Sequence, residues 1–194
     1  MKVVSAEFVK SAGKLQHYAP DDLPEVAFAG RSNSGKSSLI NSLTGYGCLA
    51  KSSTSPGRTQ LIQFFNINGR VSFADLPGYG YAKVPESVKR SWRPMIETYF
   101  RLRTNLRLVI LVADIRREIT DDERLLIDWL NLYERPVVLV LSKIDKLSNN
   151  QKAVRLKRIR ESLRTFPPEN IHPYSAKSGA GREHLWRGID MYVL

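Results

Sequence analysis

The segment Gly30-Arg31-Ser32-Asn33-Ser34-Gly35-Lys36-Ser37 follows the pattern G-x-x-x-x-G-K-S of the phosphate-binding P-loop. Glycines, which have no Cβ, let the backbone pass close to a phosphate, and successive N–H groups can point at the phosphate oxygens. The segment at 25–29, which is apolar after its first residue Glu25, predicts a short buried strand before the loop. The segment at 37–43, with Leu39, Ile40 and Leu43 on one face, predicts a helix after it. In such a loop Lys36 reaches the β- and γ-phosphates, and the Ser37 hydroxyl can take a coordination site of Mg²⁺. The order of strand, loop and helix therefore predicts an α/β nucleotide-binding fold.

A second motif discriminates between the nucleotide bases. The apolar run at 136–141 is typical of a buried parallel strand, and it ends in Ser142-Lys143-Ile144-Asp145. This segment resembles the guanine-reading motif N-K-x-D, with serine in the first place. An ionised Asp145 only accepts hydrogen bonds, so it matches the N1–H and N2–H₂ donors of guanine, and adenine has no such pair. The Lys143 stem can lie along the base. This pattern favours GTP over ATP.

Three shorter motifs occur in the order expected of a GTPase. Asp75-Leu76-Pro77-Gly78 is a D-x-x-G at the end of a strand-like segment, where Asp75 can hold a Mg²⁺-bound water and the Gly78 N–H can meet the γ-phosphate. The turn-rich stretch at 52–60 contains Thr59, a second candidate Mg²⁺ ligand and the pivot of switch I. The segment at 171–177 resembles the S-A-K element, whose N–H groups meet guanine O6. Each motif is weak alone, but five in the correct order indicate a GTPase.

These motifs together define the candidate site. Its nucleotide-binding residues are Gly30, Arg31, Ser32, Asn33, Ser34, Gly35, Lys36, Ser37, Ser38, Gly57, Arg58, Thr59, Gln60, Leu61, Asp75, Leu76, Pro77, Gly78, Ser142, Lys143, Ile144, Asp145, Tyr174, Ser175, Ala176 and Lys177. Its catalytic residues are Lys36, Thr59, Gly78 and Asn33, and its metal ligands are Ser37, Thr59 and, through water, Asp75.

Four longer stretches carry a family resemblance: GRSNSGKSSLINSL at 30–43, SPGRTQ at 55–60, DLPGYGYAK at 75–83 and MIETY at 95–99. On these stretches the chain resembles the EngB (YihA/YsxC) family of bacterial ribosome-assembly GTPases, within the Era/TrmE-like branch. The family usually has threonine where this chain has Ser142, which keeps the hydroxyl and loses the methyl. The resemblance implies a cytoplasmic GTPase that acts in late assembly of the large (50S) ribosomal subunit and is needed for normal cell division and septation.

Composition is compatible with this role. The chain of 194 residues carries 30 Lys and Arg against 19 Asp and Glu, a net charge of +11, which favours polyanionic partners. Basic residues concentrate at 146–164 and at 89–107. Such runs are often only solvated helix faces, but the overall excess and the resemblance favour contact with ribosomal RNA and proteins of a large-subunit precursor, and not with DNA. We expect a monomer.

Other sequence features favour the cytoplasm. Cys48 is the only cysteine, so no internal disulfide can form, as is usual in a reducing compartment. The longest apolar runs, 106–113 and 137–141, are too short to span a membrane, and Glu7 and Lys10 interrupt any signal-peptide core.

The alternation of predicted strands and helices indicates one Ras-like P-loop GTPase domain at 25–194, preceded by an extension at 1–24 with an added edge strand at 3–9. We expect a mostly parallel sheet with helices on both faces. A hairpin at Asn68-Gly69 between strands at 61–67 and 71–75 supplies one antiparallel strand. Further strands are expected at 106–114, 136–142 and 171–175, and helices at 85–102, from 120 or 121, at 149–165 and at 181–192.

One substitution bears on the rate. Many small GTPases place a glutamine directly after D-x-x-G to orient the attacking water, and this chain has Tyr79 there. We therefore expect slow intrinsic hydrolysis that a partner or K⁺ stimulates, with Asn33 helping to hold the K⁺. The alternative is a metabolic P-loop nucleotide or small-molecule kinase, for which Arg116-Arg117 is the only hint of an arginine-rich lid.

Overall fold

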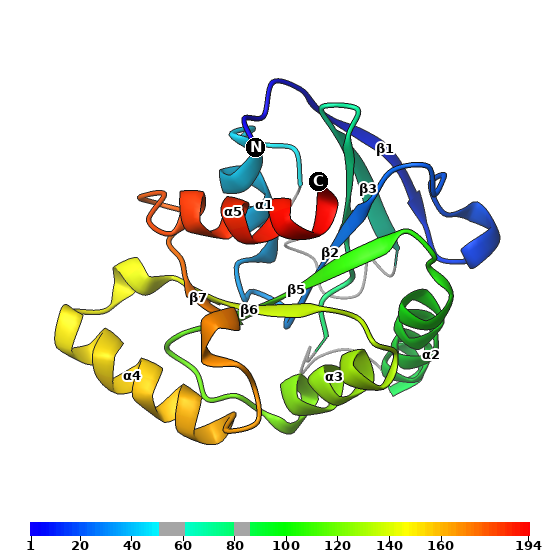
Figure 1. Cartoon of the computed structure of the whole chain (residues 1–194). Helices are drawn as coiled ribbons and strands as arrows, with labels where there is room; N and C mark the ends of the chain where they lie inside the picture. The colour runs from blue at the N-terminus through cyan, green and yellow to red at the C-terminus, as the bar shows by residue number, and fades with distance from the viewer. Residues whose placement is uncertain (51–60, 80–85) are drawn as a thin grey trace.

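The computed structural model describes residues 1–50, 61–79 and 86–194, with the backbone alone for 86–92. A seven-stranded sheet with the order β1-β3-β4-β2-β5-β6-β7 forms the centre of the molecule (Figure 1). The strands are β1 (Ala6–Ala12), β2 (Glu25–Gly30), β3 (Ile62–Ile67), β4 (Val71–Asp75), β5 (Leu106–Asp114), β6 (Val137–Ser142) and β7 (Ile171–Pro173). The helices are α1 (Lys36–Thr44), α2 (Glu86–Leu102), α3 (Asp121–Leu132), α4 (Asn149–Ser162) and α5 (Arg182–Val193).

The sheet is mostly parallel, as predicted. Strands β4, β2, β5, β6 and β7 pair in parallel, and β3 alone runs against its neighbours β4 and β1. The edge strand β1 begins at Ala6, three residues later than the predicted span of 3–9. The reason is that the Asn68 side chain accepts hydrogen bonds from the N–H groups of Val4 and Ser5, at 2.8 and 2.9 Å, so these residues fold over the β3–β4 turn.

Helices cover both faces of the sheet. Buried residues of α2, α3 and α4 share one apolar core with one face, and buried residues of α1 and α5 share another with the opposite face (Figure 1). Two helices begin with capping boxes, Thr120 with Glu123 at α3 and Ser148 with Gln151 at α4. No helix within residues 1–50, 61–79 and 86–194 has the length and apolar character needed to cross a bilayer.

Two elements end earlier than predicted. Helix α4 stops at Ser162 instead of 165, because Leu163 and Phe166 turn inward and join the core. Strand β7 stops at Pro173 instead of 175, because the next residues form a loop in which the Ser175 N–H donates to the Ala180 carbonyl at 3.0 Å.

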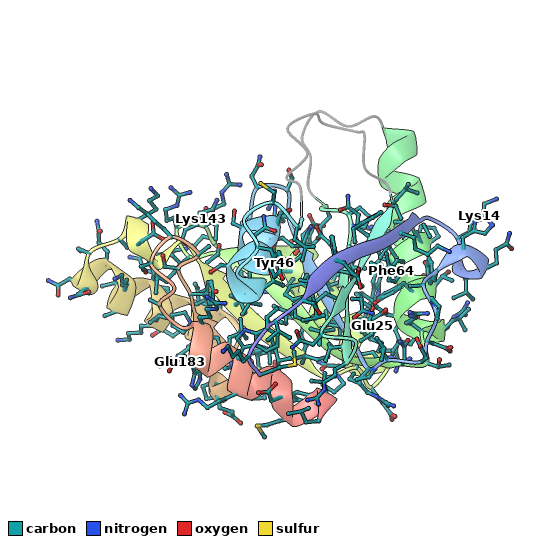
Figure 2. All side chains as sticks on the ribbon, turned by 90° about the horizontal axis from the view of Figure 1, so that it is seen from above. Lys14, Glu25, Tyr46, Phe64, Lys143 and Glu183 are labelled. Carbon is teal, nitrogen blue, oxygen red and sulfur yellow. The ribbon has the colours of Figure 1, made fainter. Side chains whose placement is uncertain are left out.

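A buried ionic network lies at the N-terminal end of β2. The Glu25 carboxylate accepts hydrogen bonds from Tyr99 at 2.6 Å, from two nitrogens of Arg103 at 2.8 Å each and from Ser72 at 2.9 Å. Arg103 also donates to the carbonyl groups of 19–20. Figure 2 shows Glu25 and Phe64 in the interior behind β1, well apart from Lys143. This network ties the N-terminal extension, β4 and α2 together at the end of the sheet away from the P-loop.

Candidate nucleotide-binding site

The P-loop connects β2 to α1 along a path that only glycine allows at its first position. A Cβ on Gly30, where φ is 157°, would lie 2.5 Å from the Val112 carbonyl oxygen and 2.8 Å from Ser34 Oγ. Asn33 and Gly35 also have positive φ, 62° and 100°, and α1 begins directly afterwards at Lys36. Alternating left-handed residues at a helix N-terminus form the type of backbone concavity that binds anions.

Two hydroxyl groups of this loop are buried without a partner. Within the described part of the chain, neither Ser32 Oγ nor Ser34 Oγ makes a hydrogen bond. Leaving a buried polar group unsatisfied costs about 1–3 kcal/mol, so such groups are uncommon unless a ligand satisfies them. The loop therefore offers unused hydroxyl groups as well as backbone N–H groups, which suits the oxygen-rich phosphate chain of a nucleotide.

Lys36 and Asp75 meet beside the loop. Lys36 Nζ donates to Asp75 Oδ1, and only 12% and 7% of the two side chains are exposed. Asp75 ends β4, the strand next to β2, so the topology alone brings it to the P-loop. Carboxylate and hydroxyl oxygens are the ligands that Mg²⁺ prefers, so Asp75 and Ser37 fit the metal role assigned to them.

The D-x-x-G segment packs directly on the P-loop. Ser32 N–H donates to the Tyr79 carbonyl at 2.9 Å, and a Cβ on Gly78 would lie 3.1 Å from Ser32 N. The preceding Leu76 is buried and donates to the Phe28 carbonyl at 3.0 Å. Gly78 is therefore held close to the phosphate loop, which is the position its predicted contact with the γ-phosphate needs.

The first two residues of the guanine motif hold the P-loop. Ser142 Oγ lies 2.5 Å from the Ser34 carbonyl oxygen and 3.1 Å from that of Ala113, which share its single proton. Lys143 adopts a left-handed conformation and donates through Nζ to the Asn33 carbonyl at 2.6 Å. The hydroxyl of Ser142 makes these contacts, so the methyl that threonine would add is not needed for them.

Asp145 is fixed by the S-A-K loop. Ser175 Oγ, which is buried, donates to Asp145 Oδ1 at 2.7 Å and lowers the pKa of the Asp145 carboxyl. The carboxylate therefore stays ionised and keeps the acceptor-only character that reading guanine requires. Ala176 and Lys177 are exposed beside it. The Tyr174 hydroxyl pairs with Ser42 on α1 at 2.8 Å, so this side chain anchors the loop.

Asp114, at the end of β5, was not identified from the sequence. Its Oδ1 accepts a hydrogen bond from Arg116 Nε at 2.9 Å and its Oδ2 accepts one from Arg116 Nη2 at 2.7 Å, and Lys143 Nζ lies 3.1 Å from the same Oδ2. Burial alone would raise the pKa of Asp114, but the hydrogen bonds from Arg116 and Lys143 outweigh it and lower the pKa to about 2. An acid directly after a long apolar strand, as at Asp75, is the signal that could have identified it.

Tyr79 is directed toward α3. Its hydroxyl donates to Glu123 Oε1 at 3.1 Å, and the other Glu123 oxygen caps the Thr120 N–H at 2.8 Å. Burial, together with the Glu123 carboxylate, raises the pKa of Tyr79. Arg31 Nη1 reaches Thr120 Oγ1 at 3.4 Å, so the same helix terminus contacts the P-loop as well. Glu123, which was not identified from the sequence, therefore connects Tyr79 to Thr120, and Thr120 in turn contacts Arg31 of the P-loop.

Four predicted site residues, Gly57, Arg58, Thr59 and Gln60, lie outside the described residues. Leu61 is exposed directly before β3; in the first turn of α1, Ser37 is half-buried and Ser38 is exposed.

Arg155, on helix α4 within the basic run at 146–164, has a structural role. Arg155 donates through Nε to the Ile115 carbonyl at 2.9 Å and also contacts the Arg117 carbonyl and Glu118, with only 14% of its side chain exposed. The interpretation of the whole 146–164 run as an RNA-facing surface is therefore wrong for Arg155. Its guanidinium holds the loop after β5.

Comparison with known proteins agrees with this geometry. A family model described as 50S ribosome-binding GTPase matches residues 25–143. The probable GTP-binding protein EngB of Geobacter metallireducens is 50% identical over 193 residues, with 100% of this chain and 94% of the relative covered. That of Syntrophus aciditrophicus is 53% identical over 189 residues, covering 97% and 95%.

A solved structure agrees in fold. The crystal structure of a probable GTP-binding protein engB superposes with a TM-score of 0.69 at 26% identity, covering 87% of this chain and 98% of that one. These relationships favour the GTPase prediction over the metabolic kinase. Sequence, fold and relatives together show that the chain belongs to the EngB family of GTP-binding GTPases.

Proposed function

We propose that this protein is a GTP-operated switch that hydrolyses GTP slowly, uses Mg²⁺ and acts in late assembly of the large ribosomal subunit, a step needed for normal cell division and septation. One observation carries the switch: three nucleotide motifs are joined through the P-loop. The Ser32 N–H donates to the carbonyl of Tyr79, directly after D-x-x-G, and the carbonyls of residues 33 and 34 accept from the guanine motif. A change at the phosphates therefore reaches both flanking loops. The proposal takes 25–194 as one GTPase domain, with the 1–24 extension adding β1 at the sheet edge.

In this proposal the residues of the chain divide the work of phosphoryl transfer to water. The P-loop N–H groups and Lys36 hold the phosphate oxygens and stabilise their developing charge, and the Gly78 N–H meets the γ-phosphate. Asp145 reads the base, with Ser175 fixing its orientation. Ser37, Thr59 and, through water, Asp75 would hold Mg²⁺, which would supply positive charge against the phosphates.

The slow rate follows from the position of Tyr79. Its side chain is buried and bonded to Glu123, so it does not replace the glutamine that aligns water in other GTPases. A second group, from the partner or a K⁺ ion beside Asn33, would then complete the reaction.

The ribosomal partner rests on the family and on charge. The matching family model is described as ribosome-binding, the net charge is +11, and α4 exposes Lys157, Arg158 and Arg160. We propose a cytoplasmic monomer that docks through RNA phosphate contacts, which weaken steeply with salt.

Nucleotide competition tests the first half of this proposal. Unlabelled GTP should displace labelled GDP, and ATP at equal concentration should not, because Asp145 pairs with the donors of guanine only. Equal displacement by ATP would contradict guanine recognition by Asp145 and would favour the alternative function as a metabolic P-loop kinase.

Co-sedimentation tests the second half. Purified large-subunit precursors should retain the protein with a non-hydrolysable GTP analogue and release it with GDP. The reason is that GDP lacks the γ-phosphate that the Gly78 N–H contacts in this proposal. Equal retention with both nucleotides would exclude the switch, and no retention in either state would exclude the partner.

A further inference from the structure

A groove with an apolar floor and a basic rim lies beside α4, away from the nucleotide motifs. Its volume is about 640 Å³, within the ~300–1,000 Å³ typical of ligand pockets. Leu156 and Pro168 supply apolar surface, and Lys157, Arg160 and Arg164 supply positive charge, with Glu161 the acidic member of the lining. Figure 1 shows α4 at one end of the molecule, so a large partner can approach it.

The groove exists because α4 ends early. After Ser162 the chain turns, Leu163 and Phe166 enter the core with 7% exposure each, and a short helical turn at Pro168–Asn170 follows. In the last two turns of α4, Ile159 is covered by the core, whereas Leu156 is left half-buried beside the groove. The basic side chains around it are exposed, in contrast to Arg155, which is engaged with the loop after β5.

We infer that this groove binds an unpaired nucleotide of RNA, with the base on the apolar floor and the neighbouring phosphates on Lys157, Arg160 and Arg164. This inference rests on the proposed ribosomal function and specifies the RNA that its basic helix recognises. The three cations of the rim exceed the single acid by two charges, which matches a polyanion.

The apolar floor decides between paired and unpaired RNA. A purely electrostatic patch prefers a duplex, because duplex phosphates are more densely spaced and release more counterions. In a duplex, however, the bases are stacked and cannot reach an apolar floor. Unpaired bases in loops and bulges can be splayed out and gain from contact with side chains.

The test uses the full chain, a labelled single-stranded RNA and a duplex of the same sequence. Wild type should bind the single strand more tightly than the duplex. Leu156→Asn should weaken single-strand binding roughly tenfold, because it removes apolar surface on which the base would be buried, and leave duplex binding unchanged. Val154→Asn, at an exposed position of the same helix outside the groove, is the matched control and should have no effect.

Two further variants keep the test decisive if Leu156→Asn disturbs folding. Ala153→Gln fills the groove from an exposed position and should lower single-strand binding without removing a core side chain. Arg160→Glu should weaken binding of both RNAs more than Arg187→Glu, the same charge change at an exposed position of α5. GDP affinity, read in parallel, should not change in any variant.

Duplex binding equal to or tighter than single-strand binding would overturn the inference, as would wild-type affinity in both Leu156→Asn and Ala153→Gln. If polyglutamate displaced the RNA at a carboxylate concentration below the phosphate concentration of the RNA, the groove would be assigned to an acidic protein segment instead. Failure of wild type to co-sediment with large subunits would remove the proposed function, whereas normal co-sedimentation with a duplex preference would remove only the groove inference.

Discussion

Replacing Asp145 with asparagine should change the base that the protein selects. Ser175 Oγ donates to Asp145 Oδ1 at 2.7 Å, so an asparagine would turn its carbonyl oxygen to Ser175 and its NH₂ group to the base. That NH₂ group is a donor, so it cannot form a hydrogen bond with the donors of guanine, but it can donate to the 2-carbonyl of xanthine. Loss of a hydrogen bond to a charged group costs about 1.5–3 kcal/mol, or roughly ten- to a hundredfold in affinity. Because 19% of the Asp145 side chain is exposed, solvent screens part of the interaction, and we expect the lower half of this range.

The assay titrates labelled GDP and xanthosine diphosphate into wild type, Asp145→Asn and Ser175→Ala. The asparagine variant should lose GDP affinity and gain affinity for xanthosine diphosphate. Ser175→Ala removes the hydrogen bond that orients the Asp145 carboxylate, so it should weaken GDP binding. Because the carboxylate itself remains, the variant should gain no affinity for xanthosine diphosphate. Since the Ser175 hydrogen bond lowers the pKa of Asp145, GDP binding by Ser175→Ala should also fail at a higher pH than in wild type as the solution is acidified. Unchanged GDP affinity in Asp145→Asn, with no gain for xanthosine diphosphate, would refute the assignment.

Three other changes probe separate parts of the molecule. Arg103→Met leaves the Glu25 charge buried and should reduce the free energy of unfolding in urea by about 3–5 kcal/mol, with GDP affinity unchanged; a loss below about 1 kcal/mol would contradict this reasoning. Asn33→Ala should abolish any acceleration of GTP hydrolysis by K⁺ over Na⁺ at equal ionic strength, and equal wild-type rates in both salts would remove the K⁺ role. Asp114 has a lowered pKa of about 2, so it stabilises the fold fully above its unfolded pKa of about 4, and this contribution is lost as the pH falls through about 2. Asp114→Asn should lack that acid-dependent step in melting temperature and bind GDP more weakly, because Lys143 loses its carboxylate partner.

The sequence predicted those parts of the site whose chemistry is local. The P-loop needs glycines at fixed spacing and Asp75 follows a strand, so both could be placed before any packing was known. Glu123 could not be placed in this way. Its carboxylate accepts the hydrogen bond from the Tyr79 hydroxyl only because the sheet brings the D-x-x-G segment next to the start of α3.

Arg155 shows a signal that the charge pattern concealed. It lies one helical turn before Ile159 and two before Leu163, both of which are buried, so helical periodicity places it on the inward stripe. The cluster of basic residues suggested one uniform surface. Position on the helix, and not residue type, separates the structural arginine from the cations that line the groove.

The ion pair between Lys36 and Asp75 leads to a last prediction, on how the ligand binds. Each charge is compensated by the other in a largely buried position, so an incoming phosphate that takes Lys36 leaves Asp75 without a partner. A cation held through water by Asp75 removes that penalty, and a cation arriving alone would in turn leave Lys36 unpaired. We therefore expect Mg²⁺ and GTP to raise each other's affinity by the same factor, as linkage requires. Titrating GTP across a series of Mg²⁺ concentrations measures this coupling, and Asp75→Asn should reduce it, because Lys36 no longer has a charged partner to exchange. A GTP affinity independent of Mg²⁺ in the wild-type protein would show that the ion pair is not exchanged on binding.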